Sequence, residues 1–280
     1  MKHRYRKLKL NKNHDEKQRG KSVFEQKISS SEDFIRADEA LFSAGLARSR
    51  SHGADLIKRG LVKFNKRPVL RPSKSVPKNE LQLLSLVEGY NNGAVSRAAE
   101  KLSGAASAFH FNFKDKTVLD VGSSTGGFTQ VALSLGAKKV IAVEVGTNQM
   151  VPELRNDPRV ELHEKTDIRD FKTDQKIDAV VIDVSFISLT KILPELLSLS
   201  KTTGSNPDII AMAKPQFEGQ PSDLNSGVIK NSAIRRQILK DLEQWLKLNG
   251  FVIKLKADSS LSGKKGNEER FYWLSALIRK

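Results

Sequence analysis

Short apolar runs alternate with amphipathic stretches through the second half of the chain. The apolar runs predict strands near 117–121, 139–145, 160–163, 178–183, 208–213, 250–256 and 270–278. Between them, apolar residues recur at helical spacing and predict helices near 126–136, 149–155, 187–199 and 232–248. Strands that alternate with helices are typical of an α/β domain with a mostly parallel sheet.

The pattern before residue 117 is different. Phe34, Ala37, Leu41 and Ala44 recur at helical spacing, and Gly45 is expected to end that helix. A second helix is expected over 49–60, with short strands at 61–64 and 69–70 after it. These elements predict a small α+β module. The domain boundaries that we expect are a disordered basic arm over 1–32, the module over 33–78, a linker over 79–93 and the larger domain over 94–280, which a helix over 94–104 opens.

Charge is concentrated at the N-terminal end. The net charge is +16, and Lys and Arg outnumber Asp and Glu by 21 to 8 over residues 1–78 but only by 27 to 24 over 79–280. The polar arm over 1–32 has no sustained hydrophobic period, apart from a weak helical pattern around 5–10. Locally concentrated positive charge favours a nucleic-acid-binding surface over a merely solubilising one, which is usually mixed in sign.

Composition excludes several kinds of site. The chain has no cysteine, which excludes disulfides and thiolate metal sites and favours a cytoplasmic setting. Its five histidines lack the spacing of metal ligands, so no metal is expected. No apolar run approaches the roughly 20 residues of a membrane span, and no apolar core follows the basic N-terminus as in a secretory signal.

The stretch TVLDVGSSTGGFTQVALSLGA over 117–137 is the strongest motif. It reads as a strand, a glycine loop and a helix, the arrangement in which a ligand sits beside the helix N-terminus. A dinucleotide fingerprint would need glycine at Ser124, and a phosphate-binding Walker loop would need Lys at Phe128. The remaining common occupant of such a loop is S-adenosylmethionine.

Acidic residues follow three successive strands. Asp120 suits the amino group of S-adenosylmethionine, Glu144 suits its ribose hydroxyls, and Asp167 suits its adenine amine. Capping of the loops by these acids is the alternative. The predicted cofactor-binding residues are Asp120, Gly122, Ser123, Ser124, Thr125, Gly126, Gly127, Phe128, Glu144 and Asp167.

Two later strands end in charged residues. Asp183 ends the run AVVID, Lys214 ends DIIAMAK, and Glu269 opens the last strand. A lysine at the end of a buried strand is costly unless it is paired, so either a reactive group or a structural ion pair is expected at Lys214.

The segment RADEALFSAGLARSRSHGADLIKRGLVKFNKRPVLRPSKSV resembles the S-four (αL) RNA-binding domain. Gly-Leu-Ala-Arg-Ser-Arg and Ile-Lys-Arg-Gly-Leu-Val carry this resemblance. A generic basic helical hairpin is the alternative. The resemblance implies RNA contacts by Arg36, Arg48, Arg50, Lys58, Arg59, Lys63 and Arg67.

The motifs Ser96-Arg-Ala-Ala-Glu-Lys101-Leu, LDVGSSTGGFT, Asp183-Val-Ser-Phe-Ile-Ser-Leu, Lys214-Pro-Gln-Phe-Glu and Gly-Asn-Glu-Glu269-Arg-Phe extend the similarity to residues 34–280. Together they resemble the TlyA-type ribosomal RNA 2′-O-methyltransferases, the "hemolysin A" proteins, which join an S-four domain to an FtsJ-like methyltransferase. The resemblance implies a Rossmann-like class I fold with a seven-stranded sheet and a catalytic tetrad of Lys101, Asp183, Lys214 and Glu269. Lys214 would be the base or stabiliser of the ribose hydroxyl, Asp183 would orient it, and Lys101 and Glu269 would hold the ribose.

Some positions depart from the family pattern. Ala98 stands where glycine is usual, Thr147-Asn148 replaces a tyrosine-glycine pair, and Ser226-Gly-Val-Ile-Lys-Asn231 replaces Gly-Gly-Val-Val-Arg-Asp. These departures concern the identity of the substrate more than the type of reaction.

The resulting hypothesis is 2′-O-methylation of ribose in ribosomal RNA with S-adenosylmethionine, and the family resemblance points to cytidines. Ribosomal RNA or ribosomal subunits are the expected partners, with no membrane and no metal. The alternatives are a non-catalytic RNA-binding or ribosome-assembly factor, a hemolysin-type membrane-active protein and a base methyltransferase. The last is disfavoured because Asp183-Val-Ser-Phe186 lacks the prolines of the amino-directed motif.

Overall fold

The computed structural model describes residues 33–87, 94–263 and 265–277. Contacts within the chain divide it into two compact units, Met1–Tyr90 and Asn91–Lys280. The expected disordered arm over 1–32, with its weak helical pattern around 5–10, lies outside the described residues. Residues 88–93 of the expected linker lie outside them as well.

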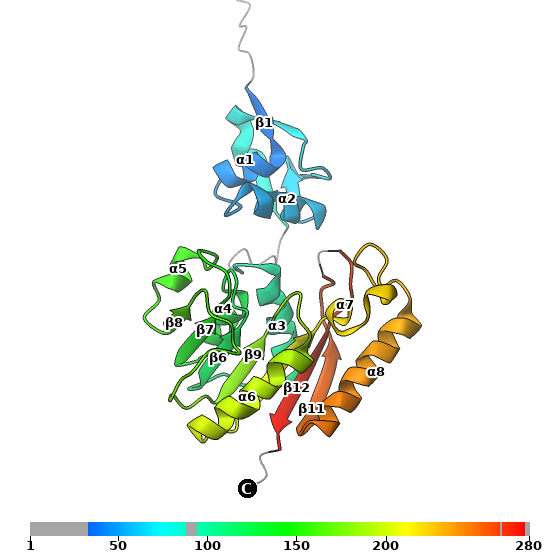
Figure 1. Ribbon diagram of the computed structural model, residues 1–280. Coiled ribbons are helices and arrows are strands. Elements are labelled where there is room, and N and C mark those ends of the chain that lie inside the picture. The colour runs from blue at the N-terminus through cyan, green and yellow to red at the C-terminus, as the bar shows by residue number, and fades with distance from the viewer. Residues whose placement is uncertain (1–32, 88–93, 264, 278–280) are drawn as a thin grey trace, which may run out of the picture. The chain divides into compact units, whose positions relative to one another are not determined.

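The N-terminal unit contains two α-helices, a 3₁₀ helix and short strands in its described part (Figure 1). In chain order its elements are β1 (Phe34–Arg36), α1 (Ala37–Ser43), α2 (Arg50–Lys58), β2 (Val62–Phe64), β3 (Arg67–Pro68), β4 (Ser75–Pro77), η1 (Lys78–Leu83) and β5 (Leu84–Leu86). β1 pairs with β4, and β2 pairs with both β3 and β5, all antiparallel. Leu41, Leu56 and Val62 lie in the core that the two helices and β2 share.

The small strands differ most from the sequence prediction. The helix expected from Phe34 begins at Ala37, because Phe34–Arg36 pairs with Ser75–Pro77. The second hairpin strand lies at Arg67–Pro68 and not at 69–70. Residues 79–87, expected as linker, continue η1 and form β5, whose pairing with β2 makes this segment part of the N-terminal sheet.

The C-terminal unit has the mostly parallel seven-stranded sheet that the sequence predicts, counted over its described residues (Figure 1). Its strands are β6 (Thr117–Val121), β7 (Lys139–Val143), β8 (Val160–His163), β9 (Ala179–Ile182), β10 (Asp208–Ala213), β11 (Phe251–Asp258) and β12 (Arg270–Ala276). They lie in the order β11-β12-β10-β9-β6-β7-β8. Among the described strands of this sheet, β12 runs opposite to the other six, and it pairs antiparallel with β10 on one side and with β11 on the other.

Helices cover both faces of this sheet. They are α3 (Arg97–Phe109), α4 (Gly127–Ser134), α5 (Pro152–Arg155), α6 (Leu189–Thr203), α7 (Pro215–Glu218) and α8 (Ser232–Leu248), with a 3₁₀ turn, η2, at Pro221–Asp223. Alternate residues of β6 point to opposite faces: Val118 packs with α3 and α4, and Leu119 packs with α6 and α8. Burial of these strands on both sides accounts for their continuous apolar sequence.

The strand bounds agree with the predicted ranges to within a few residues, whereas some helices differ more. The helix expected over 94–104 runs from Arg97 to Phe109, since Phe109 is buried against the sheet. The short helices α7 and η2 had no sequence prediction, because neither is long enough to show a hydrophobic period.

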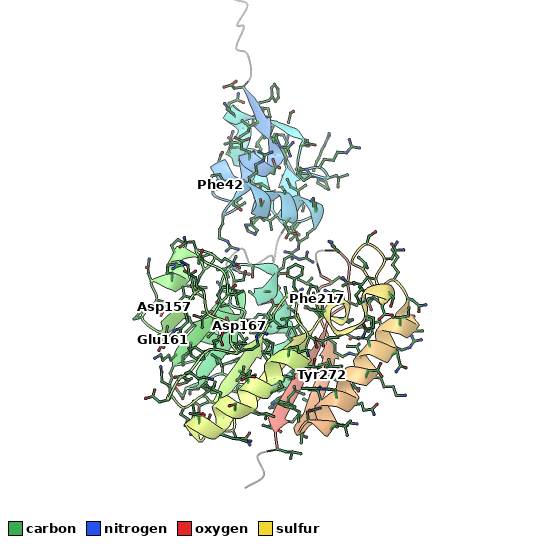
Figure 2. The ribbon with its side chains drawn as sticks, in the orientation of Figure 1. Phe42, Asp157, Glu161, Asp167, Phe217 and Tyr272 are labelled. Atoms are coloured by element: carbon green, nitrogen blue, oxygen red, sulfur yellow. The ribbon has the colours of Figure 1, made fainter. Side chains whose placement is uncertain are left out.

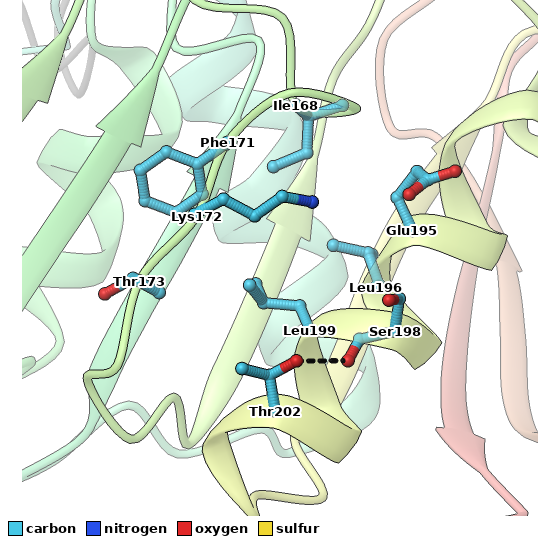
Figure 3. A pocket seen from close by; sticks show the side chains of 9 residues that line it. All are labelled: Ile168, Phe171, Lys172, Thr173, Glu195, Leu196, Ser198, Leu199 and Thr202. Atoms are coloured by element: carbon cyan, nitrogen blue, oxygen red, sulfur yellow. Dashed lines mark hydrogen bonds between the residues drawn. The ribbon is translucent and has the colours of Figure 1, made fainter.

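A small pocket lies between α6 and the loop that follows β8 (Figure 3). Its apolar lining includes Ile168, Phe171 and Leu196. Neither the glycine loop nor the predicted tetrad contributes to it. The glycine loop and the predicted tetrad residues Asp183 and Lys214 lie elsewhere, at the edge of the sheet where the parallel strands end.

Candidate active site

The carboxyl ends of four neighbouring parallel strands form the candidate site. Asp120 lies near the end of β6, Glu144 follows β7, Asp183 follows β9 and Lys214 follows β10. β6 is the first strand of this sheet along the chain, and the next two strands lie on one side of it while β9 and β10 lie on the other. Ligands of open α/β sheets bind at such a reversal of strand order.

The glycine loop between β6 and α4 makes two close backbone approaches. Gly122 has φ +82°, and a Cβ there would lie 2.9 Å from the carbonyl oxygen of Asp183. At Gly127 a Cβ would lie 2.9 Å from the backbone nitrogen of Ala99 in α3. Glycine at these positions therefore lets β6 approach β9 and lets α4 approach α3.

Asp120 is fully buried and has one oxygen available to a ligand. Its Oδ2 accepts a hydrogen bond from the Thr129 hydroxyl at 2.6 Å, whereas Oδ1 has no hydrogen-bond partner among the described residues. Burial raises the pKa of Asp120 to about 7, the charges of Asp183 and Glu144 add to this effect, and the Thr129 hydrogen bond opposes it. A buried carboxylate with a vacant acceptor fits a cationic group.

Two serine hydroxyls near the start of α4 are also buried. Ser123 Oγ and Ser96 Oγ have no hydrogen-bond partner in the part of the chain that the structure describes. Ser96 faces Gly127, because a Cβ on that glycine would collide with the Ser96 hydroxyl. The sequence prediction did not include Ser96 as a site residue; its place just before the helical motif that contains Lys101 is the signal that could have found it.

Glu144 is buried and holds the loops around it in place. Its Oε2 accepts from the Ser124 amide at 2.9 Å, and Oε1 accepts from the Gly146 amide at 2.8 Å. The Gln149 side chain lies beside this carboxylate, and the Ser124 hydroxyl donates to Gln149 Oε1 at 2.9 Å. A ribose diol at Glu144 would share these contacts or displace Gln149.

Asp167 has a different environment from the other two acids. Arg169 donates to both of its carboxylate oxygens, from Nε at 2.9 Å and from Nη2 at 2.6 Å. These hydrogen bonds hold the pKa of Asp167 below its usual range. The residue is half-buried, and its position in the C-terminal unit can be followed in Figure 2. An adenine amine would have to share this carboxylate with Arg169.

Lys214 and Asp183 form a close ion pair after the central strands. Lys214 Nζ lies 2.6 Å from Asp183 Oδ1 and donates to the Ser185 hydroxyl at 2.9 Å. Burial raises the pKa of Asp183, and the positive charges of Lys214 and Lys101 oppose that rise. The lysine thus has two oxygen partners on the loop after β9.

Lys101 and Glu269 form a second ion pair, which is buried. Lys101 lies on α3, Glu269 immediately precedes β12, and their side chains are only 9% and 4% exposed. The charge of Glu269 raises the pKa of Asp183 while that of Lys101 lowers it, so the two pairs act on one another. The structure brings all four predicted tetrad residues into one charge cluster, in the form of two lysine–carboxylate pairs.

Phe186 and Phe217, which the sequence prediction did not include, form an aromatic pair on the segments that carry Asp183 and Lys214. Phe186 is 90% exposed, and its ring centroid lies 5.1 Å from that of Phe217 on α7. Phe217 is at the edge of the C-terminal unit where β10 ends (Figure 2). Apolar periodicity could not find these residues, because Phe186 lies in a loop and Phe217 lies in the single turn of α7. Their proximity in sequence to Asp183 and Lys214 is the available signal.

The predicted RNA-binding residues of the N-terminal unit differ in their surroundings. Arg36 donates to both carboxylate oxygens of the buried Asp38, and Arg50 Nε lies 3.5 Å from the same residue. Arg59 lies 3.8 Å from Asp55. The exposed members of the set are Arg48, Arg50, Lys58 and Arg67, and those with intermediate burial are Arg36, Arg59 and Lys63.

The described residues also bear on metals and membranes. No group of three or more His, Asp or Glu side chains among them has an arrangement that could hold a metal ion. None of the helices described has the length and apolar character that crossing a membrane requires.

Two family models match the chain. The model of the FtsJ-like methyltransferases matches residues 94–276, and that of the S4 domain matches residues 35–81. The first match covers the glycine loop and both ion pairs.

Curated relatives match most of the chain. The 16S/23S rRNA (cytidine-2′-O)-methyltransferase TlyA of Mycobacterium tuberculosis is 38% identical over 85% of this chain and 89% of its own length. Hemolysin A of Brachyspira hyodysenteriae is 37% identical over 84% of this chain and 97% of its own length. A solved structure of a protein described as a hemolysin, from Streptococcus thermophilus, superposes with a TM-score of 0.68 at 33% identity and covers 88% of this chain and 90% of its own.

Proposed function

Because the chain belongs to the TlyA-type family of FtsJ-like methyltransferases with an S4 domain, we propose that it methylates the ribose 2′-oxygen of a cytidine in ribosomal RNA. The methyl donor in this proposal is S-adenosylmethionine. The observation that carries this proposal is the cluster of two lysine–carboxylate pairs beside the glycine loop. A ribose hydroxyl is a weak nucleophile, and such a cluster can bind and activate it without a metal ligand set.

The residues around the glycine loop fit S-adenosylmethionine. The vacant buried oxygen of Asp120 suits its ammonium group, and the hydroxyls of Ser96 and Ser123 with the N-terminal amides of α4 suit its carboxylate. Glu144 would accept from the ribose hydroxyls and Asp167 from the adenine amine. When bound, this cofactor supplies a methyl group that its sulfonium already activates for transfer. Gly122 and Gly126 have φ of +82° and +92°, a conformation that lets the chain turn tightly between β6 and α4.

The tetrad residues then act on the ribose. Lys214 would bind the 2′-oxygen; as a neutral amine it would accept the hydroxyl proton, and as an ammonium it would stabilise the negative charge that develops on the oxygen. Asp183 orients the Lys214 ammonium through their 2.6 Å contact. Lys101 and Glu269 would hold the ribose from the α3 and β12 side of the cluster. Holding the oxygen in line with the methyl group is expected to supply much of the rate.

Phe186 and Phe217 would hold the target base. RNA-binding proteins bind unstacked bases on exposed aromatic side chains, and an exposed ring within the loop that carries Asp183 is well suited to this role. The N-terminal unit would bind RNA phosphates through the basic side chains named above, which positions the substrate without reading its sequence.

The test is transfer of labelled methyl from S-adenosylmethionine to ribosomal subunits that lack such marks. We expect alkali-resistant label at one dinucleotide, and a decrease of about 10²- to 10⁴-fold in Lys214→Ala. Lys191→Ala, which removes an exposed lysine on α6, is the matched control and should transfer normally. Both variants should still bind the cofactor.

The other outcomes distinguish the alternatives. Label that alkali releases with the mononucleotides would indicate a base methyltransferase. If the wild-type protein binds S-adenosylmethionine but transfers no methyl to either subunit or to free ribosomal RNA, the ribose methyltransferase proposal is wrong for that RNA and a non-catalytic binding factor is favoured.

A further inference from the structure

Two loops at the candidate site are connected at several points. The first, residues 183–188, follows β9 and carries Asp183, Ser185 and Phe186; the second, residues 214–218, follows β10 and carries Lys214 and Phe217. Lys214 contacts both Asp183 and Ser185, and the two phenylalanine rings contact each other. The relative position of these loops therefore determines where the lysine and the aromatic pair meet a substrate.

Phe186 is held in a conformation that its residue type disfavours. Its φ is +66°, in the left-handed region where a bulky side chain is rare, and its ring is 90% exposed. Burial of the ring cannot compensate the cost of this conformation, since the ring makes little contact beyond Phe217. The neighbouring residues must fix it, and strained loop residues of this kind concentrate at functional sites.

Glu218 provides the contact on the far side of Phe186. Its Oε2 accepts from the Ser188 hydroxyl at 2.5 Å, and its Oε1 accepts from the Leu189 amide at 2.9 Å. Phe186 thus lies between two contacts with the second loop: Lys214 binds Ser185 on one side, and Glu218 binds Ser188 and Leu189 on the other. Burial raises the pKa of Glu218, while these two hydrogen bonds oppose the rise.

We propose that Glu218 is a positioning residue for methyl transfer, which holds the loop with Phe186 against the turn with Phe217 and so fixes the aromatic pair relative to Lys214. This inference rests on the proposed function, because it assigns the two rings to the substrate. Glu218 touches neither the tetrad nor the glycine loop in the contacts described above, and it acts through the loops that it connects.

A helix cap without further role is the competing explanation. Glu218 accepts from the first residue of α6, but the Ser188 hydroxyl already accepts from the Thr190 amide at 3.1 Å and caps the same helix. Asn231 provides a matched comparison, because its Oδ1 caps α8 by accepting from the Ala233 amide at 2.8 Å. Loss of either cap should lower the melting temperature by a similar amount.

The test compares Glu218→Gln with Asn231→Ala in the full-length protein. The glutamine keeps one acceptor oxygen for the Leu189 amide and replaces the second by an NH2 group, so the Ser188 hydroxyl can no longer donate its hydrogen bond to this side chain. We expect Glu218→Gln to lower kcat for ribosomal RNA about tenfold or more, with unchanged affinity for S-adenosylmethionine and a melting temperature close to that of Asn231→Ala. In a Phe186→Ala background the same substitution should have a much smaller effect on kcat, because the ring that it positions is absent.

The proposal would be overturned if Glu218→Gln lowered kcat equally with and without Phe186, or if its kcat equalled that of Asn231→Ala. Glu218 would then be a helix cap without a role in methyl transfer. Amide hydrogen exchange separates this outcome from failure of the proposed function. Exchange at residues 185–189 should become faster in Glu218→Gln and stay unchanged in Asn231→Ala, whether or not the wild-type protein methylates the RNA tested. Unchanged exchange in Glu218→Gln would also overturn the proposal.

Discussion

Asp120 illustrates how strongly a single residue depends on its surroundings. In the sequence it is an acid at the end of an apolar run, which would be ionised in water. In the fold it is fully buried, and its pKa is raised to about 7, chiefly by that burial. A cationic ligand would reverse the effect, because a nearby positive charge favours the ionised form.

We expect the affinity for S-adenosylmethionine to rise with pH between 5.5 and 7. Below its pKa of about 7 the Asp120 carboxyl is mostly protonated, and it must lose this proton before it can bind a cationic ligand. Each unit by which the pH lies below that pKa therefore lowers the affinity by up to about tenfold. Isothermal titration calorimetry at several pH values measures this. Asp120→Asn should bind more weakly with little pH dependence, and a pH-independent affinity of the wild-type protein would contradict the assignment.

The raised pKa of Asp120 also makes the free energy of unfolding depend on pH. Because the pKa of Asp120 is higher in the folded protein than the unperturbed 3.8, the folded state binds the proton more tightly. Through this group, the free energy of unfolding of the cofactor-free protein falls as pH rises from about 4 to 7. Ligand binding at Asp120 should remove that dependence.

At the scale of elements, the contact between α3 and α4 determines where Lys101 lies. Gly127 is the first residue of α4, and it faces Ser96, Ala98 and Ala99 at the start of α3. A side chain here would push the two helices apart. Since Lys101 is on α3 and its partner Glu269 precedes β12, displacement of α3 would open the buried ion pair.

We expect Gly127→Ala to destabilise the protein by about 1–3 kcal/mol and to lower kcat as well. Gly204→Ala is the matched control: this glycine caps α6 with φ +62°, and no described atom lies within 4 Å of its added Cβ. It should cost about 1 kcal/mol through backbone strain alone and leave kcat unchanged. Thermal unfolding and the methyl-transfer assay measure both quantities. An equal kcat for the two variants would show that the α3–α4 contact does not position Lys101.

Elements of the two units were predictable from the sequence to different degrees. The central parallel strands β6, β7, β9 and β10 of the C-terminal unit are buried on both faces, so each appears in the sequence as an apolar run from which its bounds can be predicted closely. The strands β1, β4 and β5 of the N-terminal unit each pair three residues with a partner strand, and those partners are distant in sequence. Such short strands have no local pattern, because their conformation comes from pairing.

At the scale of the whole molecule, positive charge is divided unequally between the two units. The N-terminal third carries most of the excess of Lys and Arg, while the C-terminal unit carries the tetrad and the glycine loop. This division supports separate tasks, RNA binding by one unit and methyl transfer by the other. Binding that depends on neutralised phosphates weakens as salt increases.

We expect simultaneous charge reversal at Arg48, Arg50, Lys58 and Arg59 to weaken binding to ribosomal RNA by at least about tenfold and to reduce its salt dependence. Affinity for S-adenosylmethionine should not change. Filter binding at several salt concentrations and calorimetry measure the two affinities.

The matched control is charge reversal at Lys191 and Lys201, which are exposed on α6. It should have a smaller effect on RNA affinity. An equal loss of RNA and cofactor affinity in the first variant would contradict a separate RNA-binding unit.

The sequence by itself determined the fold class and the kinds of side chain available at the ends of the strands. Apolar period and glycine position are local properties of the chain. Because the carboxyl ends of parallel strands must meet at one edge of the sheet, the strand pattern alone predicts that Asp120, Asp183 and Lys214 lie together. The family motifs added Lys101 and Glu269, which lie on elements that no local pattern connects.

Only the tertiary structure decided which groups are partners. It places Arg169 on Asp167, leaves one oxygen of Asp120 without a described partner and holds Phe186 with positive φ against Phe217. It also adds Glu218 as the contact between two loops that are separate in sequence. The physical reason is that hydrogen bonds, ion pairs and burial depend on distances between segments, and these distances exist only after the sheet has brought its strand ends together.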